Sequence, residues 1–200
     1  MITISDIELH KVFQREFPRD LARTTEGELF KFEDDRVEAE KLTGKNWEDI
    51  ESDLLQDFFD LPAWLNTRAF HYFFPAFIKQ SQVDMKKTSL LVDSLIDMLA
   101  DVEIGKWPES VKDVEAKLLA EHPEISDTLA SIDQKQVSAR RQERWKLFTK
   151  QQWALIIKWL NWINQDEKWE VNRDVLRKAI KNAENWQTTN LNTARLTSNG

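Results

Sequence analysis

The chain has 200 residues, a net charge of −7 and no cysteine, with nine tryptophans but only four glycines and five prolines. The absence of cysteine excludes disulfides, thiolate metal sites and thiol nucleophiles. The excess of acidic residues disfavours nonspecific binding to nucleic acid or anionic lipid, because both need a cationic surface.

Scarce glycine and proline mean few tight turns, which favours long helices over many short strands. Helical periodicity and breaker residues predict four helices in the first half of the chain, at about 5–16, 34–42, 46–61 and from 67 onward through an aromatic stretch. The second half is divided likewise into helices at about 88–102, 108–120, 150–164 and 173–186, with a polar, weakly periodic surface segment at 124–144.

We therefore predict an all-α fold, a single-domain bundle of about seven or eight helices over residues 1–186. Gly105 and Pro108 predict a hinge at 103–108. Residues 187–200 have no apolar period, and we expect a disordered tail there.

No stretch approaches the ~20 apolar residues that span a bilayer. The N-terminus carries acids early and lacks the basic start and apolar run of a secretory signal. We expect a cytoplasmic protein with no membrane contact. No oligomeric state is indicated.

The charge is unevenly distributed along the chain. Residues 1–103 contain 12 Lys/Arg against 22 Asp/Glu, a balance of −10, whereas residues 104–200 contain 16 against 13, a balance of +3. An acidic first half of this kind is compatible with a basic protein as partner.

The stretch FHYFFPAFI, residues 70–78, places a histidine and the only tyrosine beside Pro75. Proline inside a helix removes a backbone donor and clashes with a preceding carbonyl, so we expect the helix to be kinked or broken at Pro75. Carbonyls freed there could receive a polar ligand, with His71 and Tyr72 as acid/base or hydrogen-bonding groups and Asp49 alongside. The alternative, which is favoured, is that the polar groups of both side chains pair with these carbonyls within an ordinary core.

Two ladders of aspartates occur at helical spacing, one including Asp49 and Asp53 and the other at 93, 97 and 101. Carboxylates from two helices could together hold a magnesium ion. Solvated helix faces explain both ladders more simply, because each lies beside or opposite an apolar stripe. The three histidines have no metal-ligand spacing, and the chain has neither a nucleophile elbow nor a phosphate-binding glycine loop. We expect no metal, no cofactor and no catalytic residue.

Arginines and lysine surround Trp145 in the only basic and aromatic cluster, Arg140 to Lys146. Nucleic-acid grooves can have this composition. The overall acidity makes nucleic-acid binding the weaker reading, and docking on the acidic half of the chain is equally consistent.

The helix KQQWALIIKWLNWI is apolar over much of its circumference, with Trp159 and Trp162 on a second apolar face. Either it lies deep in the bundle or this second face binds a partner, since tryptophan is enriched in binding hot spots. Burial is the favoured alternative.

Three segments, GKNWEDIESDLL, LPAWLNTRAFHYFFPAFI and LFTKQQWALIIKWLNWI, resemble a family of uncharacterised bacterial proteins. That family has Trp-x-Asp, Phe-x-Tyr-aromatic-x-Pro-Ala-aromatic and Phe-Thr-x-x-Gln motifs. The likeness spans about 43–163 with a variable gap at 103–144, and Phe74 stands where leucine is expected in relatives. The resemblance implies a soluble bacterial helical domain and no activity.

Taken together, these features favour a noncatalytic protein-binding module. One instance would be an immunity-type inhibitor of a basic bacterial effector. The alternatives are a small-ligand binder or enzyme that uses His71 and Tyr72, and a nucleic-acid binder that uses Arg140 to Lys146. The candidate binding residues are Trp159, Trp162, Asp49, Asp53, His71 and Tyr72.

Overall fold

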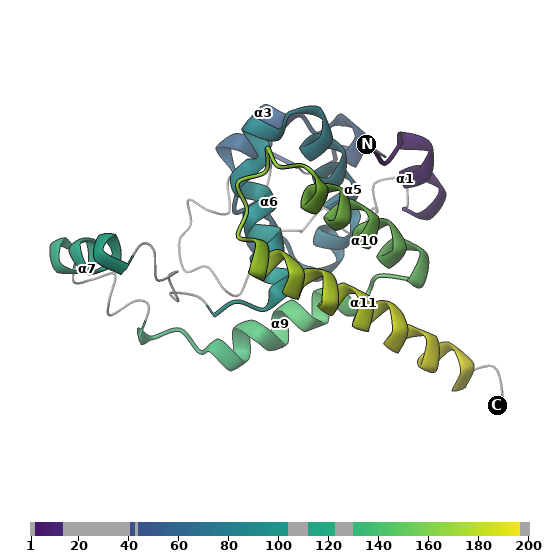
Figure 1. The fold of residues 1–200 in the computed structure, drawn as a ribbon. Coiled ribbons are helices and arrows are strands. Elements are labelled where there is room, and N and C mark those ends of the chain that lie inside the picture. Colours follow the sequence, from purple (N-terminus) through teal and green to yellow (C-terminus); the bar gives the residue numbers. More distant parts are fainter. Residues whose placement is uncertain (1–2, 14–40, 43, 104–111, 123–129, 197–200) are drawn as a thin grey trace.

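A computed structural model describes residues 3–13, 41–42, 44–103, 112–122 and 130–196 of the chain (Figure 1). These described residues form nine α-helices and one 3-10 helix and contain no strand, so the predicted all-α fold is confirmed for them. No helix among them is long and apolar enough to cross a membrane.

In chain order the elements are α1 (Asp6–Val12), η2 (Trp47–Asp49), α3 (Ser52–Asp57), α4 (Leu61–Trp64), α5 (Thr67–Val83), α6 (Met85–Ala100), α7 (Lys112–Glu121), α9 (Gln134–Lys146), α10 (Lys150–Gln165) and α11 (Arg173–Leu196).

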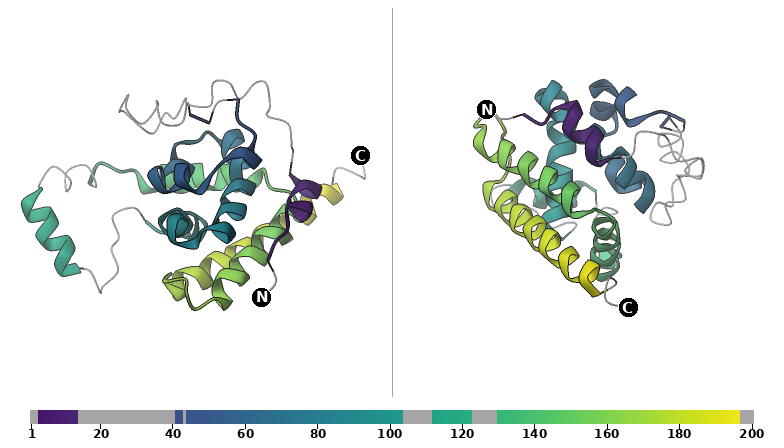
Figure 2. Two further views of the ribbon diagram at one scale, coloured as in Figure 1. Left: turned by 90° about the horizontal axis from the view of Figure 1, so that it is seen from above. Right: turned by 90° about the vertical axis from the view of Figure 1, so that its right-hand side faces the viewer.

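α5 is the central helix of the bundle, and 11 of its 17 residues are buried. It packs against α6, which follows it directly, and also contacts η2, α3 and α9. α10 and α11 lie side by side, and α11 also packs along α6 (Figures 1 and 2). A single apolar core runs from Ile4 to Ala183 and includes most of the tryptophans and phenylalanines whose burial is described.

Side-chain caps mark the starts of several of these helices, of which α1, α5 and α10 are three examples. Ser5 and Glu8 form a capping box at α1, and Thr149 and Gln152 form another at α10. The side chain of Asn66 accepts a hydrogen bond of 2.9 Å from the backbone N–H of Ala69 at the start of α5. All three caps satisfy backbone donors that the first helical turn leaves unpaired, as the local sequence predicts.

α5 continues without a break through Pro75, so of the two expected outcomes at this proline a break is excluded. Pro75 is itself buried. Phe70, Phe73, Phe74 and Phe77 are each at most 1% exposed. Burial of this aromatic stripe stabilises the helical conformation against the lost backbone hydrogen bond, because tertiary packing routinely overrides local propensity.

The predicted helix at 46–61 is wrong as one element. η2, α3 and α4 occupy this range instead. Extended residues, such as Ile50 (φ −78°, ψ 124°), separate η2 from α3, and a turn at 58–60 separates α3 from α4. The helical spacing nevertheless marks buried positions, since Trp47, Ile50 and Leu61 are all at most 1% exposed.

The C-terminal region also differs from the expectation of a disordered tail after residue 186. α11 continues to Leu196, so helical structure covers residues 187–196. Residues 197–200 lie outside the described part of the chain. The predicted hinge at 103–108, apart from residue 103, and most of the predicted helix at 34–42 lie outside it as well.

Candidate functional site

Residues 48–60 contain six Asp or Glu and no Lys or Arg, and we call them the acidic segment. Buried apolar side chains fasten this segment to the bundle, with Trp47 immediately before it and Ile50 and Leu55 within it at 0–1% exposure. Its charged side chains are therefore presented on a backbone that the core holds in place.

Three carboxylates of the acidic segment are exposed and make no hydrogen bond or ion pair with another described residue: Asp49, Glu51 and Asp57. Phe59, in the same segment, is 41% exposed. A segment that presents both an exposed aromatic ring and uncompensated carboxylates can contact a cationic protein surface.

Asp53, a predicted binding residue, forms an ion pair with Lys87 of α6. This partner raises the pKa of the Lys87 ammonium group. Asp53 therefore ties α3 to α6, and its charge is already compensated within the chain, whereas that of Asp49 is not.

His71 is half-buried and points to the junction of α5 with α1 and α10. Its Nε2 lies 2.9 Å from Oε1 of Gln152, and its ring centre lies 4.7 Å from that of Phe148. Burial lowers the pKa of His71 below its usual value of 6.5. Neutral His71 therefore donates from Nε2 to a glutamine that also caps α10.

Tyr72 is 4% exposed and turns to a different neighbour, with its hydroxyl 3.5 Å from Oδ1 of Asn46. Burial raises its pKa to about 12, and the charge of Asp49 contributes to this shift. His71 and Tyr72 thus serve separate contacts on different sides of α5. The structure does not bring these two side chains together in one pocket.

The second apolar face of α10 is covered. Trp159 is fully buried, and its indole N–H donates a hydrogen bond of 2.9 Å to Oγ of Ser81. Trp162 is 6% exposed and packs edge-on against Trp169, with ring centres 5.9 Å apart. Both candidate residues belong to the core, so the alternative of an exposed recognition face on α10 is wrong.

The basic cluster on α9 is used largely within the protein. Arg144 is 8% exposed and donates hydrogen bonds of 2.7 Å to the carbonyl oxygens of Pro62, Ala63 and Leu65. Its burial, together with the charges of two neighbouring arginines, lowers its pKa to about 10. Lys146 pairs with Glu143. This cluster does not present a free cationic groove, which removes the main support for nucleic-acid binding.

The aspartate ladder on α6 is partly desolvated. Burial, with a smaller contribution from Asp97, raises the pKa of Asp93 to about 6. Within the described residues no group of three or more His, Asp or Glu side chains is arranged to hold a metal ion. The two-helix magnesium site considered from the sequence therefore has no ligand set in this part of the chain.

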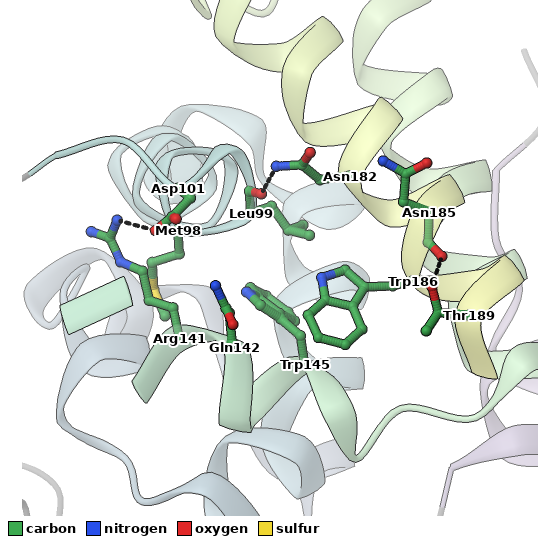
Figure 3. Close-up of a pocket in the computed structure, with 10 residues that line it drawn as sticks. All are labelled: Met98, Leu99, Asp101, Arg141, Gln142, Trp145, Asn182, Asn185, Trp186 and Thr189. Atoms are coloured by element: carbon green, nitrogen blue, oxygen red, sulfur yellow. Dashed lines mark hydrogen bonds and ion pairs between the residues drawn. The ribbon is translucent and has the colours of Figure 1, made fainter. Parts of the chain in front are cut away.

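Two neighbouring cavities lie where the C-terminal end of α6 meets α9, and both are lined by Asp101, Arg141 and Gln142. One of them, with a volume of about 340 Å³, reaches α11 and is also lined by Trp145 and Trp186 (Figure 3). No local sequence pattern indicates this region, because its residues lie far apart along the chain.

Asp101 organises the mouth of these cavities. It ends α6 in the left-handed conformation, with φ 51°, and its carboxylate accepts a hydrogen bond of 2.6 Å from Ser138. Arg141 lies 3.5 Å from the same carboxylate and also donates to the carbonyl of Val102. Burial lowers the pKa of Arg141, and the Asp101 charge opposes that shift.

Comparison of the chain with family models, with curated proteins and with solved structures gives no match.

Proposed function

We propose that this chain is a noncatalytic protein-binding module whose acidic segment binds a cationic partner protein. The observation that carries the proposal is the set of exposed, uncompensated carboxylates at Asp49, Glu51 and Asp57 in the same segment as the exposed ring of Phe59.

The charged groups and the apolar ring have separate roles in the proposed interface. Uncompensated carboxylates steer a basic protein toward the surface and orient it, which mainly raises the association rate. A partly exposed phenylalanine can supply the apolar contact that slows dissociation, as aromatic anchors do in other interfaces. The buried anchors Trp47 and Leu55 reduce the ordering cost of binding, because the acidic segment is already held in place.

An immunity-type inhibitor of a basic bacterial effector is one instance of such a module. The proposal includes a bacterial source and a cytoplasmic location, and subcellular fractionation of the host checks the location.

Capture of partners from the native host tests the proposal. The test variant neutralises the free carboxylates of the acidic segment: Asp49→Asn, Glu51→Gln and Asp57→Asn. A matched control makes the same change in net charge at exposed glutamates elsewhere: Glu167→Gln, Glu170→Gln and Glu184→Gln.

We expect wild type and control to retain the same basic protein and the test variant to lose it. The affinity should fall about tenfold when salt is raised from about 0.05 M to about 0.3 M. Absence of a specific partner, equal loss in both variants, or an affinity indifferent to salt contradicts the proposal.

A further inference from the structure

The cavity between α6, α9 and α11 has the size of a small-ligand site. Its volume of about 340 Å³ lies within the range of roughly 300–1,000 Å³ that is typical of ligand pockets. Apolar walls come from Met98, Leu99 and two indole rings, and the remaining lining residues are polar (Figure 3).

Trp145 contributes an unused hydrogen-bond donor to this cavity. It is 2% exposed, and its indole N–H has no hydrogen-bond partner among the described residues. A buried donor without a partner carries a desolvation cost that a ligand acceptor could remove. Trp153, Trp162 and Trp169 also have unpartnered indole N–H groups, but of these four tryptophans only Trp145 lines this cavity.

The two indoles that line the cavity are fixed by their other contacts. The Trp145 ring packs edge-on against Phe70 at 5.1 Å, and the Trp186 ring stacks on Trp153 at 6.4 Å with an interplanar angle of 5°. Figure 3 shows both indole nitrogens on the sides of the rings that face Leu99. Planar walls that are already ordered favour a planar guest, because little side-chain freedom is lost on binding.

The polar groups around the cavity include donors and acceptors, and their charges balance. Asp101 and Arg141 form an ion pair, and the Asp101 carboxylate also accepts a hydrogen bond from Ser138. The side chain of Asn182 donates a hydrogen bond of 2.9 Å to the carbonyl of Leu99 and keeps its own oxygen as an acceptor. The unpartnered indole N–H of Trp145 is therefore the group that favours an oxygen acceptor on a guest.

We propose that this cavity binds a small planar molecule that carries an oxygen acceptor for the indole N–H of Trp145. Such a site is independent of the acidic segment, so either could exist without the other.

Isothermal titration calorimetry with three matched probes tests this site on the full chain. Indole-3-acetamide, indole-3-acetate and tryptamine share one ring system, but only the first two carry an oxygen acceptor. We expect the first two to saturate a single site below about 10 mM and tryptamine to bind at least about tenfold more weakly.

Two substitutions on α11 locate the binding. Asn185→Trp fills the cavity mouth from an exposed position and should weaken binding of indole-3-acetamide at least about tenfold. Lys181→Trp, at an exposed position that does not line the cavity, should leave the affinity within about twofold. Trp145→Phe keeps an aromatic ring but removes the donor, and we expect a loss of about tenfold.

No saturable binding of either acceptor probe overturns the proposal, as does tryptamine binding with equal affinity. An equal effect of Asn185→Trp and Lys181→Trp also overturns it. If Trp145→Phe does not fold, as judged by circular dichroism, the comparison of Asn185→Trp with Lys181→Trp decides whether the cavity is the binding site.

Discussion

Arg144 is a buried cation that donates hydrogen bonds to backbone carbonyls of the described residues. Its guanidinium joins α9 to the end of α4 by hydrogen bonds to Pro62, Ala63 and Leu65 and lies 5.4 Å from the ring centre of Phe70. The planar fork of arginine can reach several acceptors at once, which a lysine ammonium on a flexible stem cannot do equally well.

Replacement of Arg144 by methionine is expected to lower the free energy of unfolding by about 2–4 kcal/mol, because three carbonyls lose a charged donor. Arg144→Lys should recover only part of that loss. Urea denaturation monitored by tryptophan fluorescence measures both effects. Arg177→Lys, at an exposed position, is the control and should change stability by less than about 0.5 kcal/mol. A cost for Arg144→Met as small as that of the control contradicts the assigned role.

His71 makes stability depend on pH, and the sign follows from its lowered pKa. Above the unfolded value of 6.5 the imidazole is neutral in both states, and its contribution to stability is complete. As the pH falls below 6.5 the unfolded chain binds the proton first, so stability is lost down to the folded pKa.

We expect the His71→Gln variant to lose less stability than wild type on acidification from about pH 7 to about pH 5, because glutamine stays neutral. Asp93, with its raised pKa, contributes in the opposite sense, since its stabilisation is lost as the pH rises from its ordinary 3.8 toward about 6. The contribution of Asp93 is the same in wild type and in the His71→Gln variant, so it cancels when the two are compared. Equal pH slopes in urea denaturation would show that His71 is not the responsible group.

Among the elements, α5 depends on a single side chain at its start. Asn66→Ala removes the acceptor for the N–H of Ala69 and should lower the free energy of unfolding by about 1 kcal/mol. Asn66→Asp keeps a capping oxygen and should stay within about 0.5 kcal/mol of wild type. Thermal or urea unfolding distinguishes the two variants, and an equal loss in both rejects a capping role.

Helix starts could be predicted from the sequence because a cap is a local feature. Ser5 with Glu8 and Thr149 with Gln152 each show the capping pattern within four residues, and both boxes form. The region 46–61 could not be predicted, since its apolar spacing indicates burial but does not fix backbone conformation. There, η2 packs directly on α5, and the tertiary contact decides the local structure.

The continuity of α5 through Pro75 has a similar explanation. Local chemistry at a proline favours a disruption, whereas burial of four phenylalanines on the same helix favours continuity. The end of α11 differs for another reason, because residues 187–196 lack the apolar period on which a helix prediction relies. A helix of 24 residues that packs on α6 and α10 nonetheless reaches Leu196.

At the scale of the whole molecule, the tryptophan excess is largely structural. Trp47, Trp153 and Trp159 are fully buried, and Trp145 and Trp169 are each 2% exposed. The favoured sequence interpretation of α10 as a buried helix therefore holds. The pattern alone does not assign the second apolar face of α10 to the core, because such a face is also compatible with a binding surface.

The candidate sites were only partly predictable for a physical reason. Acidity of residues 48–60 is a local property of composition and can be read directly. The cavity joins Asp101, Arg141 and Trp186, which are brought together only by the packing of α6, α9 and α11. Long-range contacts of this kind leave no trace in the periodicity of any one segment.

The dissociation constant of the captured partner for the Phe59→Ala variant tests the central claim most directly. Phe59 is 41% exposed, so its removal should leave the fold intact and raise the dissociation constant at least about tenfold. Val83→Ala, at an apolar position 68% exposed at the end of α5, is the matched control and should stay within about twofold of wild type. A Phe59→Ala variant that binds as tightly as wild type, or a Val83→Ala variant that is equally weakened, would contradict the assignment of the acidic segment as the interface.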